Sequence, residues 1–107
     1  MKKFSGNEDF EQALKTSEYF LLLKHSSTCP ISQAAYDEYE KFSSEFDNTY
    51  YLVVQEERSL SNHVAEKLQI KHESPQAILF KHGEAVWHAS HWKITYDSLK
   101  KAVTENN

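Results

Sequence analysis

Residues 19–32 read YFLLLKHSSTCPIS, an apolar run followed by a short polar stretch, a cysteine and a proline. Five consecutive apolar residues are typical of a strand that is buried on both faces, as in a parallel or mixed sheet. Pro30 suits the first position of a helix, where its missing N–H costs no hydrogen bond. Cys29, the only cysteine of the chain, is therefore expected between the end of a buried strand and the beginning of a helix.

Apolar periodicity on both sides of this junction predicts regular structure over most of the chain. The expected elements, in chain order, are a helix beginning at residues 7–9, a strand over 19–24, a helix from 30 to 48, a strand over 49–54, a helix over 60–68, strands over 76–80 and 85–89 joined by a turn at 82–83, and a last helix capped by Thr95. A helical crossover joins the first two strands, so they should be parallel, whereas the last two should form an antiparallel hairpin. The predicted fold is α/β, with a small mixed four-stranded sheet, helices on both faces and a single domain spanning residues 1–107.

Composition narrows the possible partners and compartments. The formal net charge is -4, which argues against a dedicated nucleic-acid-binding protein, since such proteins usually carry a basic face. No stretch approaches the roughly 20 apolar residues of a membrane span, and the beginning, MKKFSGNED, lacks the apolar segment of a signal peptide. We expect a cytoplasmic protein without nucleic-acid or membrane partners, in a compartment where a lone thiol stays reduced.

The predicted position of Cys29 favours a reactive sulfur. If Pro30 is the first helical residue, Cys29 is the N-cap, and its sulfur can lie near the unpaired backbone N–H groups of Ile31 and Ser32. These donors and the positive end of the helix dipole stabilise a thiolate, and the Ser32 hydroxyl could donate a further hydrogen bond to it. The alternative is a small buried core residue, which is what most free cysteines are. One sulfur without a second cysteine indicates chemistry through mixed disulfides.

Several other side chains allow a functional interpretation. Lys24 and His25 could supply positive charge to the thiolate or to an anionic substrate, or they could simply end a strand in solvent. The six histidines form no helical i, i+4 pair and have no Cys-x-x-Cys partner, so we expect no metal site. Trp87 and Trp92 are expected to pack on the hairpin rather than to bind a ligand.

Nearly the whole chain resembles the thioredoxin-like fold. The order of elements is similar, and Cys29 stands at the first strand-to-helix junction, where thioredoxins carry Cys-x-x-Cys. Here serine, Ser32, occupies the second cysteine position. Pro75 directly precedes the third predicted strand, where thioredoxin-like proteins keep a cis-proline, and X-Pro bonds reach the cis form at low cost.

The run Thr28-Cys29-Pro30-Ile31-Ser32, preceded by Lys24-His25-Ser26, resembles the monothiol bacilliredoxin family, as do the Ser74-Pro75 pair and the aromatic hairpin after it. The resemblance implies a cytosolic protein of bacillithiol-using Gram-positive bacteria that removes bacillithiol from S-bacillithiolated proteins. It implies the following site: Cys29 as nucleophile, Thr28, Pro30, Ile31 and Ser32 as its support, and Ser74, Pro75, Lys24 and His25 on the substrate side.

The same resemblance implies how the enzyme would be regenerated. Cys29 would take the bacillithiol as a mixed disulfide, and with Ser32 in the resolving position a second thiol must release it. Bacillithiol itself would be the co-substrate, with no bound cofactor. A flavin-dependent NADPH reductase of bacillithiol disulfide would act as a separate partner, since this chain has no Gly-x-Gly-x-x-Gly run.

Two other functions stay open from the sequence. Monothiol glutaredoxins that carry iron–sulfur clusters also use one cysteine, but in Cys-Gly-Phe-Ser, where this chain has Pro30-Ile31. A colourless protein after anaerobic reconstitution would argue against that function. The other is a non-catalytic thioredoxin-like binding module in which Cys29 is incidental. Unchanged activity and partner binding in Cys29→Ser would favour it.

Overall fold

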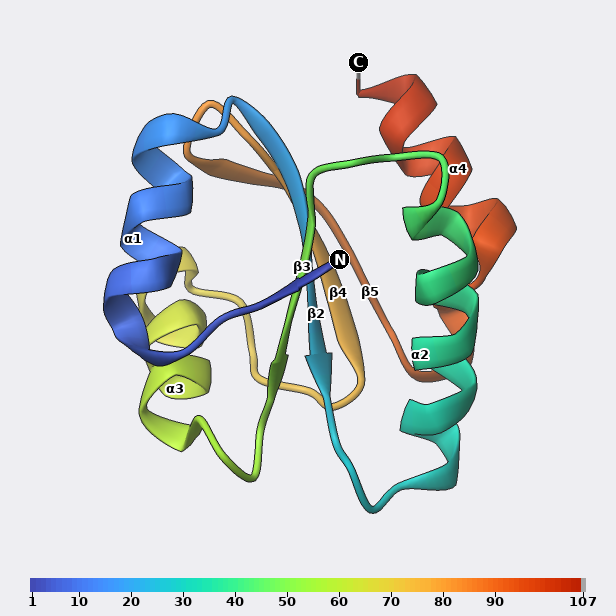
Figure 1. The fold of residues 1–107 in the computed structure, drawn as a ribbon, viewed down its shortest axis with the longest axis horizontal. Helices are drawn as coiled ribbons and strands as arrows, with labels where there is room; N and C mark the ends of the chain where they lie inside the picture. The colour runs from blue at the N-terminus through green and yellow to red at the C-terminus, as the bar shows by residue number, and fades with distance from the viewer. Residues whose placement is uncertain (107) are drawn as a thin grey trace.

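A five-stranded mixed sheet forms the centre of the protein, with two helices on each face (Figure 1). The computed structural model describes residues 1–106. The elements are β1 (Lys2–Lys3), α1 (Gly6–Thr16), β2 (Tyr19–His25), α2 (Pro30–Ser43), β3 (Thr49–Val53), α3 (Arg58–Leu68), β4 (Gln76–Lys81), β5 (Glu84–Ser90), the short 3-10 helix η1 (His91–Lys93) and α4 (Tyr96–Glu105). The predicted α/β architecture is confirmed, and the predicted strands differ from the observed ones by no more than a residue at each end.

The strands lie in the order β1-β3-β2-β4-β5. β2 runs parallel to β3 and antiparallel to β4, and β4 and β5 form an antiparallel hairpin. The hairpin turn consists of His82 and Gly83, both with positive φ (53° and 79°), as a tight two-residue turn that follows the twist of the strands requires. Both predicted pairings, parallel for the first two long strands and antiparallel for the last two, are confirmed.

Two predictions about the elements are wrong. The sheet has five strands rather than four, because the two polar residues of β1 pair with β3 although they carry no strand pattern of their own. α2 ends at Ser43 rather than near residue 48. The hydroxyls of Ser43 and Ser44 donate to the carbonyl oxygens of Glu40 and Lys41, and such bonds compete with continuation of a helix.

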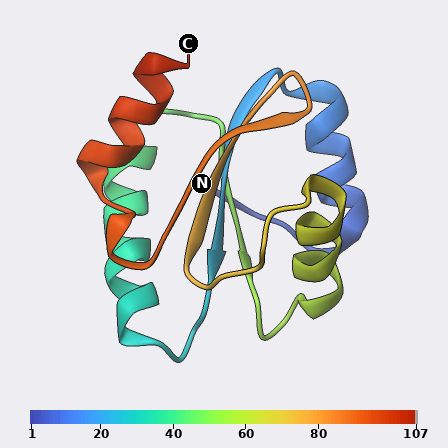
Figure 2. The same ribbon diagram turned by 180° about the vertical axis from the view of Figure 1, so that it is seen from behind.

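β2 contributes to a hydrophobic core on each face of the sheet, since its side chains alternate. Phe20 and Leu22 pack toward α1 and α3, whereas Leu21 and Leu23 pack toward α2 and α4. All four are fully buried, which explains why this strand reads as an uninterrupted apolar run. The view from behind shows the same two helical layers on either side of the sheet (Figure 2).

Three connections meet at one end of the sheet, the lower end in Figure 1. The loop after β2 leads into α2, and the loop after β3 leads into α3. Because β4 is antiparallel to β2, with Lys24 opposite Gln76, the segment that enters β4 reaches the same end. Crevices beyond the carboxyl ends of strands are the usual ligand sites of α/β sheets, so this end is where a site is expected.

Candidate active site

Cys29 lies at the predicted junction. It is the N-cap of α2, with extended backbone angles, and Pro30 is the first helical residue. The backbone N–H of Gln33 donates to the Cys29 carbonyl oxygen at 3.0 Å and closes the first helical turn. The free cysteine is partly exposed, so the alternative of a sealed core residue is wrong.

The contacts of the sulfur differ from the expected ones. Within residues 1–106, the Cys29 side chain makes no capping hydrogen bond to the first turn of α2, although Ile31 and Ser32 are placed there. A thiol is only a weak hydrogen-bond acceptor. The helix N-terminus therefore acts on the sulfur through its dipole rather than through a formed hydrogen bond.

The Ser32 hydroxyl faces the preceding loop instead of the sulfur. Ser32 is fully buried, and its Oγ accepts from the Ser26 backbone N–H at 2.8 Å and lies 2.9 Å from Nδ1 of His25. The His25 ring also packs on Tyr36, with ring centroids 4.8 Å apart. The expected hydrogen bond to Cys29 is thus replaced by a network that joins the end of β2 to the first turn of α2.

His25 belongs to this network and does not end a strand in solvent, since only 8% of the residue is exposed. Burial lowers the pKa of its imidazole, opposed by a hydrogen bond at Ser32 and by the charge of Asp37. His25 is therefore neutral near pH 7. The contact between its Nδ1 and the Ser32 Oγ orients the Ser32 side chain.

Gln55 is a site residue that the sequence analysis missed. Its Oε1 accepts from the Ser27 backbone N–H at 3.1 Å, and its Nε2 donates to the hydroxyls of Ser26 (2.7 Å) and Thr28 (3.2 Å). One side chain from the loop after β3 thus holds three consecutive residues before Cys29. One feature of the sequence could have indicated it: Gln55 is a polar residue just beyond the carboxyl end of β3, the strand that runs parallel to β2.

Ser74 and Pro75 lie beside the end of β2, as the pairing of Lys24 with Gln76 requires. The peptide bond between them is cis, as expected from the sequence. The Pro75 carbonyl oxygen accepts from the backbone N–H of His91, at 3.1 Å. Segment 74–75 is therefore tied to η1 on one side and lies next to β2 on the other.

The two tryptophans differ. Trp87 on β5 packs against the core between the sheet and the helices α2 and α4, as predicted. Trp92 in η1 is 70% exposed, so the prediction that it packs on the hairpin is wrong. Its neighbour His91 has a φ of 55°, and this backbone conformation belongs to the turn that leaves β5.

Lys24 is also buried, contrary to the interpretation as a strand end in solvent. It is 0% exposed, and its Nζ donates to the Ser61 carbonyl oxygen at 3.0 Å and lies 3.2 Å from Nδ1 of His72. Burial lowers the pKa of its amine to about 8. Its side chain points to the α1 and α3 face, as that of Leu22 does, because side chains alternate along a strand.

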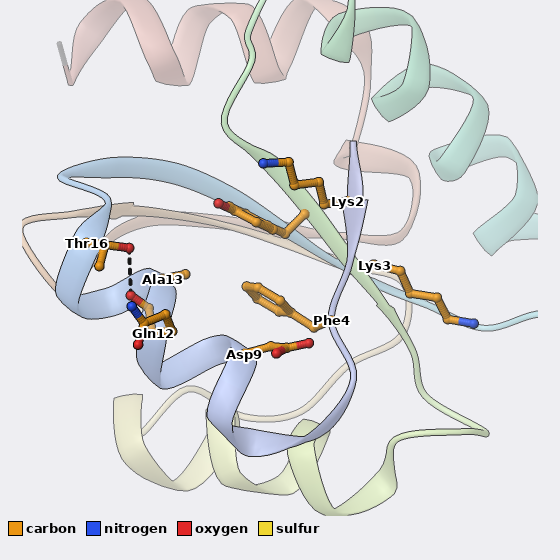
Figure 3. Close-up of a pocket in the computed structure, with 8 residues that line it drawn as sticks. Lys2, Lys3, Phe4, Asp9, Gln12, Ala13 and Thr16 are labelled. Carbon is orange, nitrogen blue, oxygen red and sulfur yellow. Dashed lines mark hydrogen bonds between the residues drawn. The ribbon is translucent and has the colours of Figure 1, made fainter.

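A cavity of 260 Å³ lies between β1 and α1, away from the Cys29 loop (Figure 3). Phe4 reaches into it and stacks on Tyr50, with ring centroids 4.6 Å apart. Asp9, on its rim, accepts from the Ser5 backbone N–H at 2.8 Å and so serves the beginning of α1. None of its lining residues carries a thiol or an imidazole, so it is a packing gap beside the edge strand.

The described part of the chain, residues 1–106, contains neither a cluster of metal-ligating side chains nor a membrane-spanning helix. No group of three or more His, Cys, Asp or Glu side chains is arranged to hold a metal ion. No helix there is both long enough and apolar enough to cross a membrane.

Comparison with known proteins adds a family and a fold. A family model described as monothiol bacilliredoxin BrxC matches residues 2–99. A solved structure described as having a thioredoxin fold, and assigned provisionally as an oxidoreductase, is 49% identical, with a TM-score of 0.90 over 94% of this chain and 91% of its own.

More distant structures agree on the fold. A mutant thioredoxin from Halobacterium salinarum NRC-1 superposes with a TM-score of 0.80 at 17% identity, over 96% of this chain and 87% of its own. A Plasmodium falciparum thioredoxin gives 0.78 at 16% identity, over the whole of both chains. The predicted thioredoxin-like fold is confirmed.

Proposed function

The chain belongs to the monothiol bacilliredoxin family of thiol–disulfide oxidoreductases, and from that premise we propose that it removes bacillithiol from S-bacillithiolated proteins. The observation that carries the proposal is a single, partly exposed cysteine at the N-cap of α2, beyond the carboxyl end of β2. A helix N-terminus favours the thiolate, which is the attacking form in disulfide exchange.

The reaction has two exchange steps. The Cys29 thiolate attacks the bacillithiol sulfur of the protein mixed disulfide, a Cys29–bacillithiol disulfide forms, and the protein thiolate leaves with the electron pair of the broken S–S bond. A bacillithiol thiolate then attacks the adduct, which releases the Cys29 thiolate and bacillithiol disulfide. A separate flavin-dependent enzyme would reduce that disulfide with NADPH.

Ser32 makes the second step depend on an external thiol. It takes the place of a resolving cysteine, and its hydroxyl is buried among His25 and the Ser26 backbone. No other sulfur nucleophile is available in the chain, since Cys29 is the only cysteine. The co-substrate proposed for regeneration is bacillithiol, with no bound cofactor.

Intact mass spectrometry tests the first step. The reduced protein is mixed with a single-cysteine peptide that carries bacillithiol, and the mass of the protein is followed. The wild type should gain one bacillithiol as the peptide thiol is released, and Cys29→Ser should gain none. Ser44→Ala, an exposed change at the C-cap of α2, is the control and should react like the wild type.

A second arm tests the thiol class. Free bacillithiol added to the charged protein should restore the original mass and yield bacillithiol disulfide. The same peptide with a glutathione adduct should react more slowly. Equal rates for both adducts, or transfer to Cys29→Ser, would contradict the proposal.

A further inference from the structure

Lys24 is a buried cation without an anionic partner. Its described hydrogen-bond partners are the Ser61 carbonyl oxygen and Nδ1 of His72, and both are neutral acceptors. Within residues 1–106, no carboxylate lies within salt-bridge distance of Lys24 or of Arg58. Buried charges are normally paired, so this amine is an exception that needs an explanation.

The protonation state of His72 follows from its neighbours. An ammonium group can only donate, so Nδ1 of His72 must accept from Lys24, and the ring proton lies on Nε2. The Ser61 hydroxyl is 3.2 Å from the same Nδ1. Burial and the charges of Lys24 and Arg58 lower the pKa of His72, which agrees with a neutral ring that offers one N–H donor.

These groups surround a small cavity. It has a volume of 100 Å³ and is lined by Val54, Arg58, Ser61, Asn62 and His72. Its wall thus combines the guanidinium of Arg58, the side-chain amide of Asn62 and the imidazole of His72. The Lys24 amine lies behind this wall and is hydrogen-bonded to His72. Donors and positive charge in a partly enclosed site are what a carboxylate requires.

The acidic side chains near this cavity have other partners. Glu57, the N-cap of α3, accepts from the Gly6 backbone N–H at 3.0 Å. A hydrogen bond from Ser90 lowers the pKa of Glu73. Neither carboxylate lies within salt-bridge distance of the Lys24 amine. The charge of Glu73 acts on His72 and opposes the lowering of the pKa of that ring, but among the described residues no carboxylate forms an ion pair with Lys24 or Arg58.

The cavity adjoins the Cys29 loop. The backbone N–H of Val54, one of its lining residues, donates to the His25 carbonyl oxygen at 2.8 Å. The next residue, Gln55, bonds Thr28, the neighbour of Cys29. On the other side, His72 lies three residues before the cis-proline Pro75. The cavity is therefore at the same end of the sheet as the thiol.

We propose that the cavity bounded by Arg58, Asn62 and His72, with Lys24 behind it, binds a carboxylate of the low-molecular-weight thiol that becomes attached to Cys29. This inference rests on the proposed function and deepens it, because the malyl group of bacillithiol carries carboxylates. The bound anion supplies the counter-charge that Lys24 lacks, and it orients the adduct for exchange.

The test compares two adducts on one C-terminally amidated peptide without acidic residues, so that any carboxylate comes from the adduct. One adduct is bacillithiol and the other is cysteamine, which has no carboxylate. Arg58→Ala should lower kcat/KM for the bacillithiol peptide about tenfold, the loss expected for one hydrogen bond to a charged group. It should change the rate with the cysteamine peptide less than twofold. Arg58→Lys should recover part of the loss, since it keeps the charge but not the planar fork.

Lys15→Ala is the matched control, since it also removes one exposed positive charge but lies in the last turn of α1. It should leave both rates unchanged. Asn62→Ala should show the same adduct selectivity as Arg58→Ala, with a smaller loss, and circular dichroism checks that each variant is folded.

A binding measurement gives a readout besides activity. Sodium malate added to the reduced wild type should shift the imidazole NMR signals of His72 and raise the pKa of that ring, but not in Arg58→Ala. If the wild type does not act on the bacillithiol peptide, the proposed function is wrong. If it does, but Arg58→Ala slows both adducts equally or malate leaves His72 unmoved, the carboxylate site is wrong.

Discussion

At the scale of single residues, the buried charge of Lys24 lowers the stability of the folded state, although its amine lies behind the proposed carboxylate site. Burial disfavours its charged form, which is why the pKa of its amine falls to about 8. Because the folded-state pKa lies below the unfolded value of 10.5, the unfolded chain binds more protons between these two pH values. Stability therefore rises with pH in this window, and below about pH 8 the full destabilisation is present.

We predict that Lys24→Met stabilises the protein. Replacing an unpaired buried charge by an apolar side chain of similar length should raise the free energy of unfolding by about 1–4 kcal/mol at pH 7. The advantage over the wild type should shrink as the pH rises from 8 to 10.5. Urea unfolding at pH 7, 9 and 10.5 measures this, and an advantage that is constant with pH would contradict it.

At the scale of the elements, the Cys29 loop is held from two sides. Ser32 in the first turn of α2 bonds the Ser26 backbone, and Gln55 beyond β3 bonds the same loop by three hydrogen bonds. Gln55 contacts no reacting atom in the structure, so it is a positioning residue. A loop held in one conformation keeps the thiol in place for attack without a further loss of entropy.

We predict that Gln55→Ala slows attack by Cys29 about three- to tenfold, the range expected when one or two net hydrogen bonds are lost. The Ser27 amide should exchange its proton faster, because its described acceptor is removed. Stopped-flow rates and NMR hydrogen exchange measure the two effects. Gln33→Ala is the control, since it removes an exposed side-chain amide that donates to Asp37 on the same helix and leaves the backbone bond to Cys29 in place. An unchanged rate in Gln55→Ala would contradict the positioning role.

Sequence patterns predicted the elements well where an apolar face repeats. Local signals of this kind are the apolar run at 19–23, the apolar stripe of α3 and the capping residue Thr95. The Oγ1 of Thr95 accepts from the Ser98 backbone N–H at 3.0 Å. β1 could not be predicted, because its two lysines gain their conformation only from pairing with β3.

The site was predictable in part for the same reason. Cys29 and Pro75 carry positional signals along the chain. The partners of Lys24 are set by which side chains the folded layers bring together, since Ser61 and His72 lie far from it in sequence. Gln55 likewise reaches the Cys29 loop because β3 pairs in parallel with β2, which brings the ends of both strands to the same edge of the sheet.

At the scale of the whole molecule, one sheet separates two cores. Phe10, Leu60 and Val64 cover one face, and Tyr39 and Leu99 cover the other, all fully buried. β2 runs between them and contributes side chains to both. Neither helical layer can lose its packing without exposing the strand on which the other layer rests.

We predict that Leu22→Ala and Leu21→Ala, which open cavities in opposite layers, each lower the free energy of unfolding by about 2–5 kcal/mol. Both variants should still unfold in one transition, because the layers share β2. Urea curves followed by far-ultraviolet circular dichroism and by tryptophan fluorescence should coincide. Separated transitions in Leu22→Ala would show that the layer of α1 and α3 melts on its own.

Trp92 gives the protein a built-in optical reporter. Trp92 is 70% exposed, whereas Trp87 is partly covered on β5, so we expect the long-wavelength edge of the emission spectrum to come mainly from Trp92. Its neighbour His91 is bonded to the Pro75 carbonyl oxygen, which places the fluorophore next to the cis-proline segment. Docking of a larger molecule at that end would move the emission to shorter wavelength. The rate at which a protein substrate binds could then be measured separately from the rate of disulfide exchange, without any added dye.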